Sequence, residues 1–470
     1  MNVLFFNLER NFVQGKIYHP IHPNPPLDIG YCASVLDKNE HKTFFLDTAI
    51  DALTIDSVMS FIRKENIETV VTKPHLSVIS ATLNLSKEIK KTFPDIKILC
   101  MGPSVTYLLS SFLFENSPID ACIVGEAEYT LRDFLNSENN FEVDGIAFFD
   151  KNIKMTKNRK LIENLDELPY PKHNFFLNRG YTIYYPLHAR SKLNLGFMFT
   201  SRGCPFKCIF CSPIDGRSTF GNLFRFRNPE NVVDEIEYLT SLGVNSICFY
   251  DSVFTANRDK VRKICNLIID RKIDISWTAE TRVNAVDKIT LEKMKRAGCS
   301  SLAFGIESGS DRILKKLNKV ATVEQAKDAV NLTKNCGIDP VGFFIIGNPT
   351  ETVDEMKQSL KLALSLPLDM IQVSFFTPFP GSPAYSELNF DGNLDKYNMQ
   401  NASNTTQLSL VSPSSLVMFQ KYFYKRFYIS PRFLSRYLIR FIKSTLNHNS
   451  RNEIKLWKEA YEYIFLKQND

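Results

Sequence analysis

The chain has 470 residues, of which 44% are hydrophobic, and a formal net charge of +6. This length can support two or three domains, each with its own core. The modest charge, without a lysine-arginine block, disfavours a nucleic-acid partner. No apolar run reaches membrane-spanning length. The first residues, MNVLFFNLERN, lack a basic region before their apolar run, so we expect a first strand rather than a signal peptide.

Short apolar runs alternate with helical patterns through the first 150 residues. This alternation predicts a parallel, doubly wound α/β sheet of the Rossmann type. The expected strands are 3–6, 43–46, 69–72, 96–101 and 121–124, and the expected helices are 28–38, 53–64, 77–92 and 127–136. Ligands of such sheets bind beyond the carboxyl ends of the strands. Here those ends are the loops at 7–26, 47–48, 73–75, 102–106 and 125–126.

A second domain is expected to begin near residue 195. Residues 151–194 form a connector that contains the proline-rich run ELPYPKHNFF. The strand predicted at 195–200 leads directly into a cysteine-rich loop. We therefore divide the chain into residues 1–150, the connector 151–194, a second domain at 195–394 and a C-terminal helical region at 395–470.

Three cysteines, Cys204, Cys208 and Cys211, lie within eight residues in the pattern CxxxCxxC. A [4Fe-4S] cluster takes four ligands, so three thiolates leave one iron open for a small molecule. Three buried thiols or a zinc site are the alternatives. Zinc usually takes four protein ligands in a closed site, and no second cysteine pair or nearby histidine follows. The spacing therefore favours a cluster.

The other seven cysteines need no special role. In a chain without an export signal, we expect them to be reduced thiols in the cytosol, where a cluster could be assembled. Most lie in apolar surroundings typical of small core residues. They are Cys32, Cys100, Cys122, Cys248, Cys265, Cys299 and Cys336.

Residues 199–213, FTSRGCPFKCIFCSP, resemble the cluster loop of the radical S-adenosylmethionine (radical SAM) enzymes. The resemblance includes Gly203 and Pro205 beside the first cysteine and Phe210 before the last. It implies that the amino and carboxylate groups of S-adenosylmethionine chelate the open iron, with Phe210 among its contacts. It also implies that an electron from the reduced cluster splits the sulfonium to a 5′-deoxyadenosyl radical. An external low-potential donor, such as flavodoxin or ferredoxin, would supply that electron.

Strand and helix patterns alternate again after the cysteine loop. Six strand-helix units predict a partial (β/α)6 barrel rather than a complete one of eight, with its chemistry at the carboxyl ends of the strands. The later strands are expected at 245–250, 274–279, 300–305, 339–346 and 370–376, and the helices at 229–242, 257–271, 288–297, 322–336 and 351–365.

The end of the second strand resembles the part of the family site that holds the methionine moiety, and the end of the third strand carries an arginine. Asp251 and Ser252 follow the second strand, where the family places a turn that receives the amino group. Ser252 departs from the second acidic residue of many relatives, so the turn is a firmer expectation than a side-chain contact by Asp251. Arg282, after the third strand, is a candidate to hold the carboxylate, and a structural ion pair is its alternative.

The next strand ends resemble the family's nucleoside-binding motifs. In FGIESG, Glu307 and Ser308 resemble the ribose-binding motif, with Glu307 accepting from hydroxyl groups, and a surface carboxylate is the alternative. In FFIIGNPTE, Gly347 belongs to a segment similar to the one that packs against adenine. The segment TPFPGSP, residues 377–383, ends the sixth strand and is expected to face substrate.

The first domain resembles the cobalamin-binding domain that precedes the radical SAM core in a large subclass of these enzymes. The resemblance rests on NPPLDIGYCASVL, LCMGPSVTYL and IVGEAEYTLRDFL. It implies that small residues in one loop leave room for the nucleotide tail of cobalamin, and that a second loop lies beside the first. The candidate residues are Gly102, Ser104, Val105 and Thr106 in the first loop and Gly125 and Glu126 in the second.

The sequence lacks the Asp-x-His-x-x-Gly motif whose histidine ligates cobalt in another large group of cobalamin proteins. His19, His22 and His75 do not have that context, so we expect no histidine ligand. A cobalamin domain that has lost its cofactor is the alternative.

The C-terminal region interleaves aromatic residues with lysine and arginine, as in MFQKYFYKRFYISPRFLSRYLIRFIK. Helical spacing predicts a docking helix pair whose aromatic residues are core. Peripheral membrane or lipid contact is the alternative, since an interfacial helix has a basic face beside an aromatic one.

The resemblance implies a cytoplasmic cobalamin-dependent radical SAM methyltransferase that acts on an unactivated carbon of a small-molecule or lipid substrate. One S-adenosylmethionine would methylate cobalt, and a second would supply the radical that abstracts hydrogen from substrate. The corrin and the open iron must then face each other across one cavity. A ring-forming or oxidative radical enzyme of the same architecture is one alternative. A zinc- or cluster-binding protein without turnover is the other.

Overall fold

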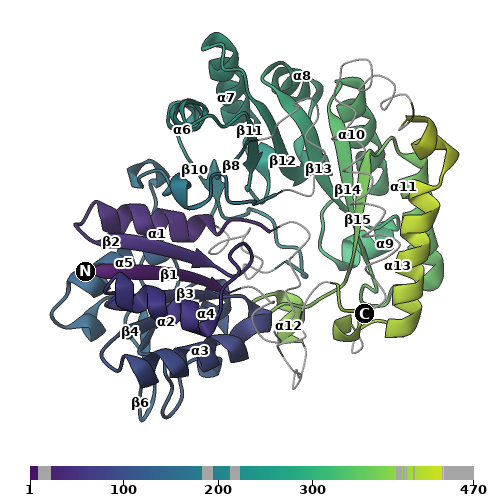
Figure 1. The fold of residues 1–470 in the computed structure, drawn as a ribbon. Coiled ribbons are helices and arrows are strands. Elements are labelled where there is room, and N and C mark those ends of the chain that lie inside the picture. Colours follow the sequence, from purple (N-terminus) through teal and green to yellow (C-terminus); the bar gives the residue numbers. More distant parts are fainter. Residues whose placement is uncertain are drawn as a thin grey trace.

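A computed structural model describes residues 1–8, 23–182, 194–211, 223–387 and most of 394–438. His19 and His22, the middle of the loop at 7–26 and the last 32 residues lie outside the described ranges. The chain forms two lobes, an N-terminal α/β lobe and a larger barrel lobe (Figure 1).

The N-terminal lobe contains a seven-stranded sheet in the order β2-β1-β3-β4-β5-β6-β7. The first five strands of this order are parallel, and β6 and β7 add an antiparallel edge. The strands are β1 (Asn2–Leu8), β2 (Lys42–Asp47), β3 (Thr69–Pro74), β4 (Lys97–Cys100), β5 (Ala121–Ile123), β6 (Ile146–Asp150) and β7 (Asn152–Met155). The doubly wound sheet is as predicted, and the β6–β7 hairpin is an addition.

Helices cover both faces of this sheet because its central strands are apolar on both sides. Along β1, Val3 and Phe5 pack towards α1 and α5, whereas Leu4 and Phe6 pack towards α2 and α3. The helices are α1 (Leu27–Asp37), α2 (Ile55–Lys64), α3 (Ile79–Thr92), α4 (Pro103–Tyr107) and α5 (Ala127–Asn136).

The second lobe is a six-stranded parallel sheet in the order β15-β14-β13-β12-β11-β8. Its curved, open form is the predicted partial barrel (Figure 1). The strands are β8 (Leu195–Met198), β11 (Ser246–Phe249), β12 (Ser276–Arg282), β13 (Cys299–Glu307), β14 (Asp339–Ile346) and β15 (Met370–Phe375). β12 ends later than the predicted 274–279, because the motif ETRVN continues the strand.

Helices cover the outer surface of the barrel around a large apolar core. Two of them begin with reciprocal capping boxes, Thr322 with Gln325 and Thr352 with Glu355, which satisfy free backbone N–H groups. The outer helices are α6 (Pro229–Ser241), α7 (Arg258–Asp270), α8 (Lys288–Arg296), α10 (Val323–Asn335) and α11 (Val353–Ser365). Two short helices, α9 (Asp311–Lys316) and α12 (Pro383–Ser386), lie beside the cysteine loop instead.

A final helix, α13 (Pro413–Tyr428), runs along the outside of the barrel beside β15 (Figure 1). Phe423, Tyr424 and Phe427 are buried in the barrel core, so these aromatic residues are core, as the docking-helix interpretation predicts. The hydroxyl of Tyr424 accepts from the backbone N–H of Val373 at 2.8 Å, and the Gln420 amide donates to the Val373 carbonyl at 2.7 Å. In the described ranges, no helix combines the length and the apolar composition that crossing a bilayer requires.

Candidate active site

The cysteine loop lies between two short strands that pair with each other in antiparallel fashion. These strands are β9 (Ser201–Arg202) and β10 (Arg225–Phe226). Buried Asp251, after β11, accepts hydrogen bonds from the backbone N–H and hydroxyl of Thr200 and from the hydroxyl of Ser201. Burial raises the pKa of Asp251. Its carboxylate therefore anchors the base of the cysteine loop, while the turn at Ser252 stays a candidate contact for the amino group.

The three cysteines lie over the carboxyl end of the barrel. Cys208 is buried, and Cys204 and Cys211 are half-buried. The Arg282 guanidinium donates to the Cys208 sulfur at 3.1 Å and stacks over the Phe206 ring, with 3.9 Å between its central carbon and the ring centre. Its buried Nη2 makes no hydrogen bond. A guanidinium nitrogen without a hydrogen-bond partner could bind a carboxylate ligand, and this role of Arg282 stays a prediction.

The outer side of the loop is fixed by α9 and by the turn that follows it. Ile209 donates its backbone N–H to the Leu317 carbonyl at 3.1 Å, and the Asn318 amide donates to the Lys207 carbonyl at 2.7 Å. Phe210 packs against a small apolar cluster that includes Ile313 and Leu317. The loop that carries the cysteines is therefore held by backbone and apolar contacts independent of the thiols.

A buried ion pair lies at the end of β13. Lys319 Nζ is 2.6 Å from Glu307 Oε1, and both side chains are more than nine-tenths buried. Glu307 has a φ of +68°, a strained conformation for a residue with a side chain. A Cβ on Gly305 would lie 2.4 Å from Oε1 of Glu307 and 2.6 Å from Nζ of Lys319, so only glycine leaves room for the pair. Glu307 is thus not a surface carboxylate.

A second carboxyl group, Glu280 on β12, lies close to this ion pair. Burial, with a further contribution from the charge of Glu307, raises the pKa of Glu280 to about 8. No sequence motif identified Glu280 beyond its place in ETRVN, and none identified Lys319. Left-handed backbone at Asn318 and Val320 flanks Lys319, which lies buried between these two exposed residues.

Ser308 and Gly347 shape the neighbouring turns. The Ser308 hydroxyl lies 3.3 Å from the Ser359 hydroxyl of α11, so it joins the loop to that helix. Gly347 has a φ of +73°, and a Cβ there would lie 2.8 Å from the side chain of Leu416 in α13. Buried Asn348 donates its backbone N–H to Glu351 at 3.0 Å and closes the turn. Both predicted residues therefore have a packing role at this edge.

The N-terminal lobe presents its own edge at the ends of β4 and β5. Thr106 links the two loops, because its hydroxyl accepts from the Gly125 N–H at 3.2 Å and donates to the Gly102 carbonyl at 3.3 Å. A Cβ on Gly125 would meet no atom within 4 Å, whereas one on Gly102 would touch the flexible side chain of Lys73. Open space at Gly125 fits a bound ligand. Ser104 and Val105 are buried, with Val105 in the apolar core.

Glu126 is held by the barrel lobe. One carboxylate oxygen accepts from Arg202 at 2.9 Å, and the other accepts from Arg225 at 2.9 Å and from the Ile162 backbone N–H at 2.7 Å. Arg202 also donates to Glu128 at 2.5 Å. Burial opposes ionisation of Glu126, but the two guanidinium groups keep its pKa below the usual value. This carboxylate joins the lobes through the two strands that flank the cysteine loop.

The carboxyl edges of the two sheets face each other. Three contacts mark this arrangement. The Tyr250 hydroxyl, after β11, donates to Asn24 in the segment before α1 at 2.9 Å, and the Arg202 ion pairs join β9 to α5. At the far end of the barrel, Gly381 lies against the Tyr107 ring of α4. The predicted opposition of the two domains is therefore present.

Comparison with known proteins decides the family. The profile of the radical SAM superfamily matches residues 198–363, from the end of β8 into α11. An uncharacterized methyltransferase of Pyrococcus horikoshii is 33% identical over 364 residues, with 76% of this chain and 77% of the relative covered. The chain belongs to the radical SAM superfamily.

Two further similarities extend beyond the core of this radical SAM protein. The anaerobic magnesium-protoporphyrin IX monomethyl ester cyclase of Rubrivivax gelatinosus is 29% identical over 411 residues, with 80% of this chain and 71% of the cyclase covered. The solved structure of OxsB, a cobalamin-dependent S-adenosylmethionine radical enzyme, matches 98% of this chain and 79% of its own, with a TM-score of 0.69 at 17% identity. The latter likeness shows a shared fold across both lobes.

Membership of the radical SAM family makes the [4Fe-4S] cluster and S-adenosylmethionine the cofactors of the barrel. Among the described residues, no group of three His, Cys, Asp or Glu side chains is placed to share a single metal ion. A cluster does not need such convergence, because each of its cysteines binds a different iron. Of the seven other cysteines, six are buried and Cys336 is half-buried, as expected for core residues.

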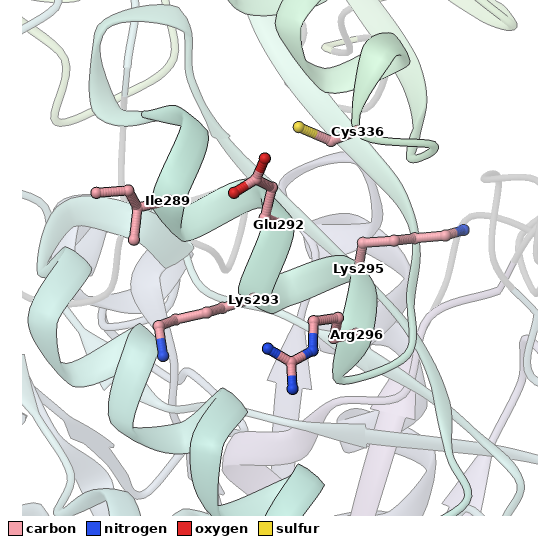
Figure 2. Close-up of a pocket in the computed structure, with 6 residues that line it drawn as sticks. All are labelled: Ile289, Glu292, Lys293, Lys295, Arg296 and Cys336. Atoms are coloured by element: carbon pink, nitrogen blue, oxygen red, sulfur yellow. The ribbon is translucent and has the colours of Figure 1, made fainter.

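An open pocket of about 450 Å³ lies on the opposite side of the radical SAM barrel. Figure 2 shows its lining, which comes from α8 together with Cys336 after α10. Both helices lead into the amino ends of strands, so this pocket is remote from the cysteine loop. Burial and the charge of Glu292 raise the pKa of Cys336, which is therefore no reactive thiolate.

Proposed function

We propose that this radical SAM enzyme binds cobalamin at the edge of its N-terminal lobe and methylates an unactivated carbon of a small-molecule substrate. The opposition of the two carboxyl edges is the observation that carries the proposal. A methyl donor on one lobe and a radical source on the other must reach one carbon between them. The relative from P. horikoshii is named a methyltransferase, and OxsB binds cobalamin in a fold that covers both lobes.

In the barrel lobe, we assign the cluster to Cys204, Cys208 and Cys211. Arg282 would hold the carboxylate of S-adenosylmethionine through its free Nη2, and Glu307 would accept from the ribose hydroxyls. Phe210, the turn at Asp251 and Ser252, Ser308 and Gly347 would complete the pocket. When bound, the cluster would supply the electron that cleaves the sulfonium, and these residues would orient that bond and exclude water.

In the N-terminal lobe, the space beside Gly125 would admit the cofactor. Gly102, Ser104 and Thr106 would shape the neighbouring loop, with Val105 packing it onto the core. Glu126 would contribute indirectly, because both its oxygens are engaged with the barrel lobe. When bound, cobalamin would supply the methyl group. We propose no histidine ligand to cobalt, and the ring of His75 accepts from the Ser77 backbone N–H as the cap of a short helical turn.

The experiment is anaerobic incubation of reconstituted protein with hydroxocobalamin, S-adenosylmethionine and a low-potential reductant. S-adenosylmethionine with a trideuterated methyl group is added together with candidate small molecules, lipids and peptides. A product that gains three deuterons supports the proposal. Absence of cobalamin binding by folded, cluster-loaded protein refutes it.

A ring-forming oxidation is the second candidate. The similarity to a magnesium-protoporphyrin IX monomethyl ester cyclase over 80% of this chain favours it. The labelled cofactor separates the two, because a ring-forming product loses hydrogen and gains no deuterium. If S-adenosylmethionine is cleaved but neither kind of product forms, the tested mixtures do not contain the substrate. If S-adenosylmethionine is not cleaved at all, both candidate functions are wrong.

A further inference from the structure

We infer that residues 377–386, here called the clasp segment, fix the distance between the cluster site and the N-terminal cofactor edge. The inference rests on the proposed function, since that distance matters only if both edges hold cofactors. The clasp segment follows β15 and ends with α12, which lies between the two lobes in Figure 1.

The sequence of the clasp segment dictates a rigid turn. The sequence FPGS at positions 379–382 is typical of a type II turn, with proline second and glycine third. The backbone N–H of Ser382 donates to the Phe379 carbonyl at 2.9 Å, and Gly381 has a φ of +84°. Ser382 then caps α12 by accepting from the Tyr385 N–H at 3.2 Å. A turn and a capped helix leave this short segment little freedom.

On one side, the clasp segment is anchored in the N-terminal lobe. Phe379 is 9% exposed and belongs to the apolar core that contains Val105 of α4. It packs edge-on against fully buried Tyr397, with 5.7 Å between ring centres. A Cβ on Gly381 would lie 2.8 Å from the ring of Tyr107, the last residue of α4. The clasp segment therefore touches the helix that carries the predicted cobalamin loop.

On its other side, the clasp segment holds the cysteine loop. The backbone N–H of Ala384 donates to the Ile209 carbonyl at 3.1 Å. Ala384 shares an apolar cluster with Ile209 and Phe210, the two residues before Cys211, and Phe376, just before the clasp segment, belongs to the same cluster. One segment of ten residues thus contacts both the loop of the cluster and the loop of the second cofactor.

This arrangement makes Phe379 a positioning residue for the reaction. Although it lies in the segment expected to face substrate, its ring is buried in the core of the N-terminal lobe, and it acts through α4 on one lobe and through α12 on the other. Without its ring, both loops keep their own internal contacts, but their separation is no longer set by the clasp segment. The expected result is an enzyme that still cleaves S-adenosylmethionine and binds cobalamin while the two cofactors are misplaced relative to each other.

The test compares Phe379→Ala with Phe433→Ala in full-length, cluster-loaded protein. Phe433 is 8% exposed in the outer barrel core, so its truncation costs similar packing away from both edges. The measurement is the magnetic coupling between added cob(II)alamin and the reduced cluster, by electron paramagnetic resonance. Phe379→Ala should lower this coupling at least twofold, with cobalamin retention and substrate-free cleavage of S-adenosylmethionine within twofold of wild type.

Two more variants keep the outcome interpretable. Phe379→Leu, which refills the anchor site, should restore the coupling, and Tyr107→Ala, at a half-exposed position that tolerates truncation, should lower it less than Phe379→Ala. Unchanged coupling in Phe379→Ala would overturn the inference. Equal loss in Phe433→Ala would also overturn it, because general destabilisation would then suffice.

A cofactor-free measurement separates this inference from the proposed function. If wild-type protein binds no cobalamin, the proposed function is wrong, and hydrogen exchange then tests the clasp segment alone. Phe379→Ala should raise exchange in both 102–107 and 204–211, and Phe433→Ala in neither. Raised exchange in one segment only would show that the clasp segment does not couple them.

Discussion

The two facing edges use charge differently. At the barrel edge, buried charged groups support one another, as in the Glu307–Lys319 pair and the contact of Arg282 with Cys208. At the N-terminal edge, the loops are made of small residues, with open space at Gly125, and the buried carboxylate Glu126 pairs with the other lobe. The first edge is preorganised for a small charged ligand, whereas the second leaves room for a bulky one.

The largest expected effect is loss of the cluster site at the barrel edge. Cys204→Ala, Cys208→Ala or Cys211→Ala should each abolish the cluster absorbance and lower cleavage of S-adenosylmethionine by about 100-fold or more, since two thiolates hold a cubane poorly. Cys336→Ala is the matched control, because this half-buried cysteine lies at the opposite end of the barrel. Iron content and deoxyadenosine formation are measured, and full iron retention in all three variants would contradict the assignment.

A bulky residue at Gly125 should break the N-terminal edge alone. Gly125→Leu would fill the open space, so we expect loss of cobalamin retention while substrate-free cleavage continues. The backbone cost at positive φ is about 1–2 kcal/mol. Gly243, at a distant turn, has a φ of +85°, against +84° for Gly125, so Gly243→Leu controls for that backbone cost. Gly102→Leu should have the same effect if its loop admits the cofactor. Normal cobalamin retention in both variants would move the site elsewhere.

Removal of the negative charge at Glu307 should weaken the binding of S-adenosylmethionine without loss of the cluster. Glu307→Gln should raise the dissociation constant of S-adenosylmethionine about tenfold, since a charge-assisted hydrogen bond contributes about 1.5–3 kcal/mol. Glu307→Ala should also lower the stability by about 3–5 kcal/mol, because it leaves Lys319 buried without its partner. Anaerobic equilibrium dialysis and denaturant unfolding measure the two effects. Unaltered binding in Glu307→Gln would leave Glu307 only its structural ion pair.

The smallest expected effect is a change in how the free energy of unfolding depends on pH. Glu280 has a pKa of about 8 in the folded protein, and an unfolded glutamate ionises well below that. Between these values the folded state holds one proton more, so wild-type stability falls as pH rises towards 8. We expect wild type to lose stability relative to Glu280→Gln between about pH 5 and pH 8, by at most about 1.4 kcal/mol per pH unit. A pH-independent difference in the free energy of unfolding would contradict a carboxyl group that is protonated in the folded protein.

Local motifs predicted much of this organisation from the sequence. The strand-helix alternation predicted both parallel sheets, and the CxxxCxxC spacing identified the loop that the family profile covers. These signals lie within short stretches of chain. Glu126 shows the limit, because its partners Arg202 and Arg225 lie 76 and 99 residues further on, and no local pattern specifies such a pairing.

Lys319 illustrates a second limit. Its sequence context, LNKV, resembles an ordinary exposed helix end, yet its ammonium group is buried against Glu307. The reversal depends on left-handed backbone at Asn318 and Val320, which sequence does not predict for a β-branched valine.

The hydrogen bonds between α13 and β15 have a consequence for the solution behaviour of the protein. A six-stranded open barrel ends in a strand whose free N–H and C=O groups can pair with another chain and seed aggregation. Here hydroxyl and amide side chains, from Tyr424 and Gln420, occupy those groups at Val373. A helix cannot extend a sheet, so α13 caps the open edge of the barrel against strand addition as well as packing on it.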